Sequence, residues 1–62
     1  MKLYELPRNT YFTFKEDTTK EQFFFDHIDG MYSVCFNRFQ DLVHVSAMAE
    51  VERVEDGLNR LG

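Results

Sequence analysis

The sequence predicts an all-β protein, a small antiparallel barrel of five or six short strands. The run from Gln22 to Val54 alternates strand-like segments with tight turns and shows no helical period. Seven phenylalanines and three tyrosines stand among only 62 residues. Because one buried aromatic side chain covers roughly 150–250 Å², a few rings can form the core of so short a chain.

The first third of the chain predicts two extended segments and a polar loop. Residues Lys2–Leu6 form a short β-type segment that Pro7 ends, since proline has no N–H for a strand ladder. The segment Thr10–Lys15 is rich in β-branched and aromatic residues, and its two phenylalanines share one face. Residues 16–21 are wholly polar and form the longest loop before the main sheet.

A hairpin follows at the centre of the chain. Residues 22–28 predict a strand with Phe24, Asp26 and Ile28 on one face and Phe23, Phe25 and His27 on the other. Three successive phenylalanines thus place rings on both faces, so the second face must be covered by another strand or be exposed. Asp29-Gly30 predicts a type I′ turn, whose central residues both need positive φ.

The remaining strands are shorter. Residues 31–37 predict a strand whose apolar face is formed by Tyr32, Val34 and Phe36. A second hairpin at residues 38–41 leads to a strand at 42–46, with Val43 and Val45 facing inward. A single 3₁₀ turn at 46–49 precedes the last strand at 50–54.

Residues 1–56 therefore predict one small β-barrel domain, and residues 57–62 a flexible C-terminal tail. The order of a long loop, two tight hairpins, a 3₁₀ turn and a final strand resembles the Src-homology-3-like barrel. In a chain this short, closure of the barrel would hide the edge strands.

Charge and cysteine content narrow the class of protein. The formal net charge is −4, which argues against phosphate-backbone binding as the main role. The lone Cys35 excludes an internal disulfide and predicts a buried small hydrophobe, as in a reducing cytoplasm. No signal peptide and no membrane-spanning stretch are recognised, so we expect no membrane partner and a location in the cytoplasm.

No catalytic, cofactor-binding or metal-binding residues are expected. Ser33 and Ser46 lack a nucleophile motif, and no glycine-rich phosphate loop occurs. His27 and His44 have carboxylates nearby, but their spacing matches no metal-ligand motif, and Asp26 and His27 are expected on opposite faces of their strand. The chain is therefore not expected to be an enzyme.

Four residues are candidates for protein binding: Phe39, Tyr32, Met31 and Asp29. Phe39 lies in a predicted turn, where side chains are normally polar, so it either anchors a partner or folds back to cap the barrel. Met31 and Tyr32 follow the Asp29-Gly30 turn and form a small apolar corner.

The strings Phe25–Ser33 (FDHIDGMYS), Val43–Val45 (VHV) and Ala49–Val51 (AEV), with the opening Lys2–Pro7 (KLYELP), resemble a family of small uncharacterised proteins from tailed bacteriophages. The resemblance covers nearly the whole chain. It implies a phage-encoded accessory protein in the host cytoplasm and no catalytic residues.

The expected function is a protein-binding module that engages a host or viral protein. One alternative is a barrel that binds single-stranded nucleic acid, with Tyr4, Tyr11 and Phe23 as stacking platforms beside Lys2, Arg8, Lys15 and Lys20. Another is a virion or self-assembling component, such as a homodimer that buries the second face of the residue 23–25 strand.

Overall fold

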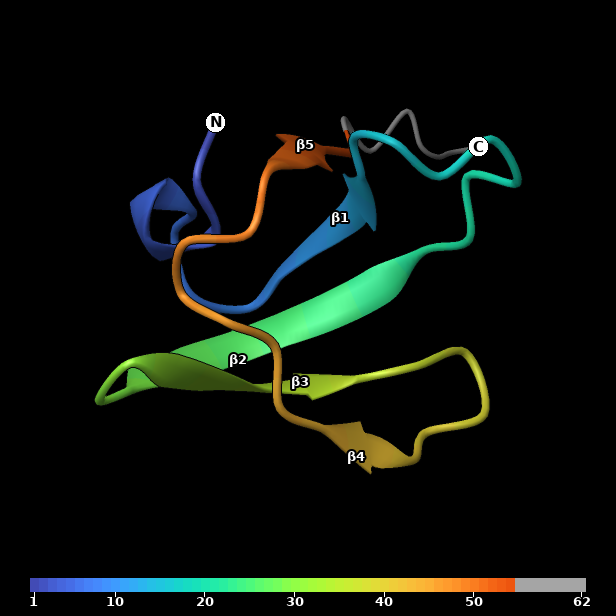
Figure 1. The fold of residues 1–62 in the computed structure, drawn as a ribbon. Coiled ribbons are helices and arrows are strands. Elements are labelled where there is room, and N and C mark those ends of the chain that lie inside the picture. The colour runs from blue at the N-terminus through green and yellow to red at the C-terminus, as the bar shows by residue number, and fades with distance from the viewer. Residues whose placement is uncertain (55–62) are drawn as a thin grey trace.

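The computed structural model describes residues 1–54 and has an all-β fold, with five antiparallel strands in one open sheet (Figure 1). The strands are β1 (Thr10–Phe14), β2 (Phe23–Asp29), β3 (Tyr32–Phe36), β4 (Leu42–Val43) and β5 (Val51–Arg53), in the spatial order β4-β3-β2-β1-β5. The predicted tail at 57–62 lies outside the described residues.

The sheet is not closed into the predicted barrel. Strands β4 and β5 lie at its two opposite edges and are only two and three residues long. Such short strands present too few backbone groups for the ladder that closure requires.

The predicted N-terminal β segment is instead a 3₁₀ helix, η1 (Leu3–Glu5). The Glu5 carboxylate accepts a hydrogen bond of 2.8 Å from the Lys2 backbone N–H, and the Leu6 N–H closes the turn on the Leu3 carbonyl. This local capping competes with extended pairing, so only a single bridge from Lys2 to Glu50 remains of the predicted strand.

A β-bulge at Asp26 changes the predicted faces of β2. Phe25 pairs with Cys35, but the next pair is His27 with Val34, so Asp26 is an extra residue. Because a one-residue shift reverses the alternation, Ile28 lies on the same face as Phe25. The prediction that Ile28 shares a face with Phe24 is therefore wrong.

The bulge also changes the hairpin turn. Asp29 pairs with Tyr32, so the two loop residues are Gly30 and Met31. Among these residues only Gly30 has positive φ, at 66°, which fits a type II′ turn with glycine at its first central position. The hairpin was predicted correctly, but its turn type and central residues were not.

The predicted strand at 42–46 keeps one register with β3 but is interrupted in the middle. Leu42 pairs with Phe36, and a bridge of the same register joins Ser46 to Tyr32. Between them the Ser33 hydroxyl donates to the Val45 carbonyl at 2.9 Å. Side-chain hydrogen bonds replace ladder bonds here, so regular strand structure is limited to β4.

A single turn precedes the last strand, as predicted. The Ala49 N–H donates to the Ser46 carbonyl at 3.0 Å, an i→i+3 bond of the 3₁₀ type that is not repeated in the following residues. The chain then enters β5.

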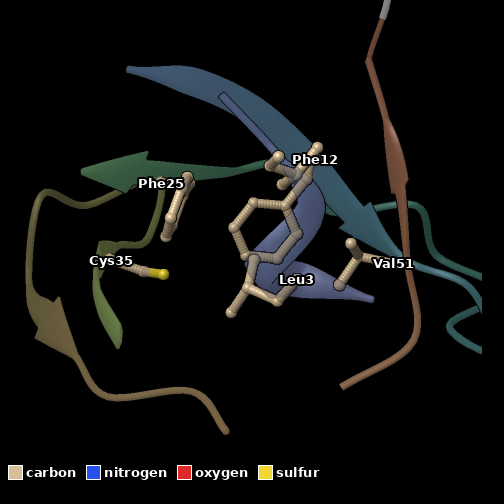
Figure 2. Packing of buried hydrophobic residues seen from close by; sticks show 6 residues of the cluster. Leu3, Phe12, Phe25, Cys35 and Val51 are labelled. Atoms are coloured by element: carbon tan, nitrogen blue, oxygen red, sulfur yellow. The ribbon is translucent and has the colours of Figure 1, made fainter. Parts of the chain in front are cut away.

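The core lies on one face of the sheet and is closed by η1. Leu3 from η1 meets Phe12, Phe25, Cys35 and Val51, all essentially inaccessible to solvent (Figure 2). Val43 and Val45 pack against this cluster, which confirms their predicted inward orientation, and the buried Cys35 confirms the prediction for the lone thiol.

The apolar face of β3 is turned away from the core. Ser33 and Cys35 are the fully buried residues of this strand, whereas Tyr32 is exposed. Phe24 and Phe36 are directly opposite each other on adjacent strands and so lie on the side away from Phe25 and Cys35. We call this side of the sheet the outer face.

Candidate functional site

The structure separates the four residues that the sequence proposes for protein binding. Asp29, Met31 and Tyr32 are all exposed at the β2–β3 hairpin, whereas Phe39 lies in the loop between β3 and β4, at the opposite end of β3 (Figure 1). The four do not form one surface. Near each of the two ends lie further residues that the sequence did not propose for protein binding.

At the hairpin end, backbone hydrogen bonds bring three distant segments together. The Ala47 N–H donates to the Met31 carbonyl at 2.9 Å, and the Tyr4 N–H donates to the Ala47 carbonyl at 3.1 Å. Met31, Met48 and Tyr4 are 80 %, 58 % and 51 % exposed. We call these three residues the methionine patch.

Met48 and Tyr4 could not be assigned to this patch from the sequence. The sequence did offer one signal for Met48: it is a large apolar residue in a predicted tight turn, where polar residues are favoured. Its neighbourhood with Met31 depends on hydrogen bonds between residues far apart in the chain.

Phe39 is exposed on a loop that is held by hydrogen bonds to the Asn37 side chain. The Asn37 side-chain oxygen accepts hydrogen bonds from the backbone N–H groups of Phe39 (2.8 Å) and Asp41 (2.9 Å). Gln40 takes a positive φ of 67°, and the Arg38 guanidinium lies 4.8 Å from the Phe39 ring centroid. The ring is 67 % exposed, so it does not fold back over the core.

Beside this loop, a row of apolar side chains crosses the outer face. Tyr11 pairs with Phe24, Phe24 with Phe36, and Phe36 with Leu42, so that one residue comes from each of four strands. Directly opposed residues point to the same side of a sheet. We call these four residues the outer row.

The outer row borders a groove of about 520 Å³. Its lining residues are Tyr11, Gln22, Phe24, Phe36, Asn37, Arg38 and Gln40. The Tyr11 and Phe24 rings meet edge to face, with centroids 5.1 Å apart. The lining has one cation and no carboxylate, although the chain carries a net charge of −4.

The signal for the outer row was present in the sequence. Three successive phenylalanines in β2 required rings on both faces, and the strand at β3 offered an apolar face of its own. Only the register between strands shows that these positions fall in line.

Each of the two histidines forms a hydrogen bond within the protein. His27 Nδ1 is 2.6 Å from Asp26 Oδ2, because the bulge removes the expected alternation between these neighbours. His44 Nδ1 is 3.0 Å from the Ser33 carbonyl oxygen. Within residues 1–54, no group of three or more His, Cys, Asp or Glu side chains could hold a metal ion.

Two of the lysines considered for nucleic-acid binding lie in ion pairs. Lys2 Nζ is 2.6 Å from Glu50 and Lys20 Nζ is 3.5 Å from Glu52. The hydrogen bond from Lys2 lowers the pKa of Glu50 and, reciprocally, Glu50 raises the pKa of Lys2. Phe23, considered as a stacking platform, is partly buried and packs against Phe12, with ring centroids 5.8 Å apart.

Comparison of the chain with protein-family models, with curated proteins and with solved structures finds no significant match. Over residues 1–54, the structure has no helix of the length and apolar character needed to cross a membrane.

Proposed function

We propose that this chain is a small phage-encoded accessory protein that binds a host or viral protein in the host cytoplasm without catalysing a reaction. The observation that carries the proposal is the methionine patch. Three large side chains, each at least half exposed, belong to the hairpin tip, η1 and the turn before β5, and backbone hydrogen bonds join these three segments.

The chemistry of the patch suits recognition of protein. Methionine is flexible and polarisable, and it adapts to differently shaped apolar partners. Tyrosine adds a large contact area with a polar end. Asp29 and Tyr32, which pair at the base of the same hairpin turn, supply polar and aromatic groups at the margin of the patch.

The proposed architecture is a half-open relative of the Src-homology-3-like barrel. Its support is the strand order β4-β3-β2-β1-β5, in which the last strand returns to pair with the first. Small sheets of this kind leave their loops free for binding.

Affinity capture from host and phage-infected lysates, with quantitative mass spectrometry, tests the proposed function. The bait is the wild-type chain, compared with the double variant Met31→Ser, Met48→Ser. We expect the double variant to retain at least about tenfold less of a specific partner, since central contact residues carry most binding energy.

The matched control is Leu42→Ser, because Leu42 is 54 % exposed but lies in the outer row rather than the patch. A partner that binds the control and wild type equally, but not the double variant, supports the proposal. Equal retention by wild type and double variant, or capture of no specific partner, contradicts it.

A further inference from the structure

We infer that the outer face is a homodimer interface, in which Phe39 of each copy inserts into the groove of the other. This inference concerns a different surface from the methionine patch and does not depend on the proposed function. It accounts together for two features that are unusual alone: an exposed phenylalanine on a hydrogen-bonded loop and a groove with aromatic walls beside it.

The Phe39 side chain, which we call the knob, lies next to the groove. Arg38 lines the groove and also stacks on the Phe39 ring, so the two features are adjacent but do not fill one another. A closed two-fold interface uses the same patch on both copies, and residue i of one meets residue j of the other reciprocally. Because each copy has one knob and one groove, a two-fold dimer forms the contact between Phe39 and the groove twice.

The groove has the chemistry and the size for a phenyl ring. Tyr11, Phe24 and Phe36 offer aromatic walls, and rings favour offset or edge-to-face contacts with one another. A volume of about 520 Å³ gives room for one phenylalanine side chain.

The loop that carries Phe39 is held in one conformation by hydrogen bonds within the single chain. The two hydrogen bonds to the Asn37 side chain hold the backbone on both sides of Phe39. Less conformational entropy is therefore lost on association than for a ring on an unrestrained loop.

A second sheet is the natural cover for this face. Sheets bury an apolar face against another layer, and within residues 1–54 the second layer, η1 and its neighbours, lies on the core side. A standard interface takes about 800 Å² from each partner, roughly a fifth of the 4182 Å² surface of this chain. One side of a molecule this small provides that area.

Electrostatics gives the dimer a distinctive salt dependence. Each copy carries a net charge of −4, so two copies repel one another, whereas the groove lining has no carboxylate. Salt screens the repulsion and does not weaken apolar contacts. Dimerisation should therefore tighten as salt rises, by a few-fold between 50 and 500 mM NaCl on the scale of Debye screening.

Sedimentation equilibrium of the purified chain, from about 10 μM to 1 mM to span affinities typical of weak interfaces, tests the inference. We expect a monomer–dimer equilibrium that Phe39→Ser and Tyr11→Glu each weaken at least about tenfold, since both remove an interface anchor. Both positions are exposed, and circular dichroism checks that each variant folds.

Mixing the two variants is the decisive measurement. Phe39→Ser keeps its groove and Tyr11→Glu keeps its knob, so their heterodimer retains one intact contact and should form more tightly than either homodimer. Met48→Ser, in the methionine patch, is the control and should dimerise as the wild type does. A monomer at 1 mM in 500 mM NaCl, a mixture no tighter than its components, or loss of the dimer in Met48→Ser would overturn the inference.

Discussion

At the residue scale, Ser33 is the most consequential polar side chain of the core. It is fully buried, and its hydroxyl lies 2.9 Å from the Val45 carbonyl and 3.1 Å from Cys35 Sγ. The His44 ring meets the Ser33 carbonyl from the same segment. Ser33 thus joins β3 to the interrupted part of the neighbouring segment, where the regular ladder is absent.

We expect Ser33→Ala to lower the free energy of unfolding by about 1–2 kcal/mol, because the Val45 carbonyl loses its donor in a partly buried place. Urea denaturation monitored by circular dichroism measures the change. The control is Thr18→Ala, an exposed residue in the loop before β2, for which the effect should stay within about 0.5 kcal/mol. Equal effects of the two substitutions would contradict this role of Ser33.

At the element scale, the β2–β3 hairpin depends on the bulge at Asp26 and on Gly30. The bulge moves the register by one residue, so that Asp29 pairs with Tyr32 and Gly30 takes the first loop position. Gly30 has a φ of 66°, and a Cβ at this position would meet no atom within 4 Å. Its requirement is therefore conformational and not steric.

Gly30→Ala should cost about 1–2 kcal/mol of stability, the usual penalty for an L-residue held in the left-handed region. Gly30→Asn should cost less, since asparagine tolerates that region through local hydrogen bonds. Thermal unfolding of both variants beside the wild type measures the order. An alanine variant as stable as the asparagine variant would argue against positive φ as the reason for glycine.

At the scale of the whole molecule, the N-terminal residues join β5 and the residue before it to the core. The Val51 N–H donates to the Met1 carbonyl at 2.8 Å, and Lys2 Nζ and the terminal amine lie 2.6 and 3.6 Å from Glu50. These contacts hold Leu3 over the core, where it completes the buried cluster (Figure 2).

The lowered pKa of Glu50, caused first by the hydrogen bond from Lys2, predicts a pH dependence. A carboxyl whose pKa is lower in the folded state stabilises the fold above its unfolded pKa and loses that contribution as the pH falls through the folded pKa. The wild type should therefore have a higher melting temperature than Glu50→Gln at pH 7. The two melting temperatures should converge as the pH falls below about 4. A difference that persists unchanged in acid would exclude the ion pair as its cause.

Local patterns in the sequence determined much of this protein. Alternation and turn residues predicted β1, β2, β3 and their hairpins, because strand propensity and tight turns depend on near neighbours. The inward direction of Val43 and Val45 followed from the same alternation, whereas the burial of Cys35 was predicted from the hydrophobic character of a lone cysteine. The polar surroundings of Phe39 marked it as unusual before its exposure was known.

Only the tertiary structure decided which apolar face of the sheet is the core, where the bulge falls and why the sheet stays open. The Asp26 bulge is a property of two strands paired together, and η1 covers the Phe25 face through hydrogen bonds between residues more than 40 positions apart. The outer row and the methionine patch exist for the same reason. Each is an alignment of segments distant in the chain, and such alignment depends on register and long-range hydrogen bonds that no single segment encodes.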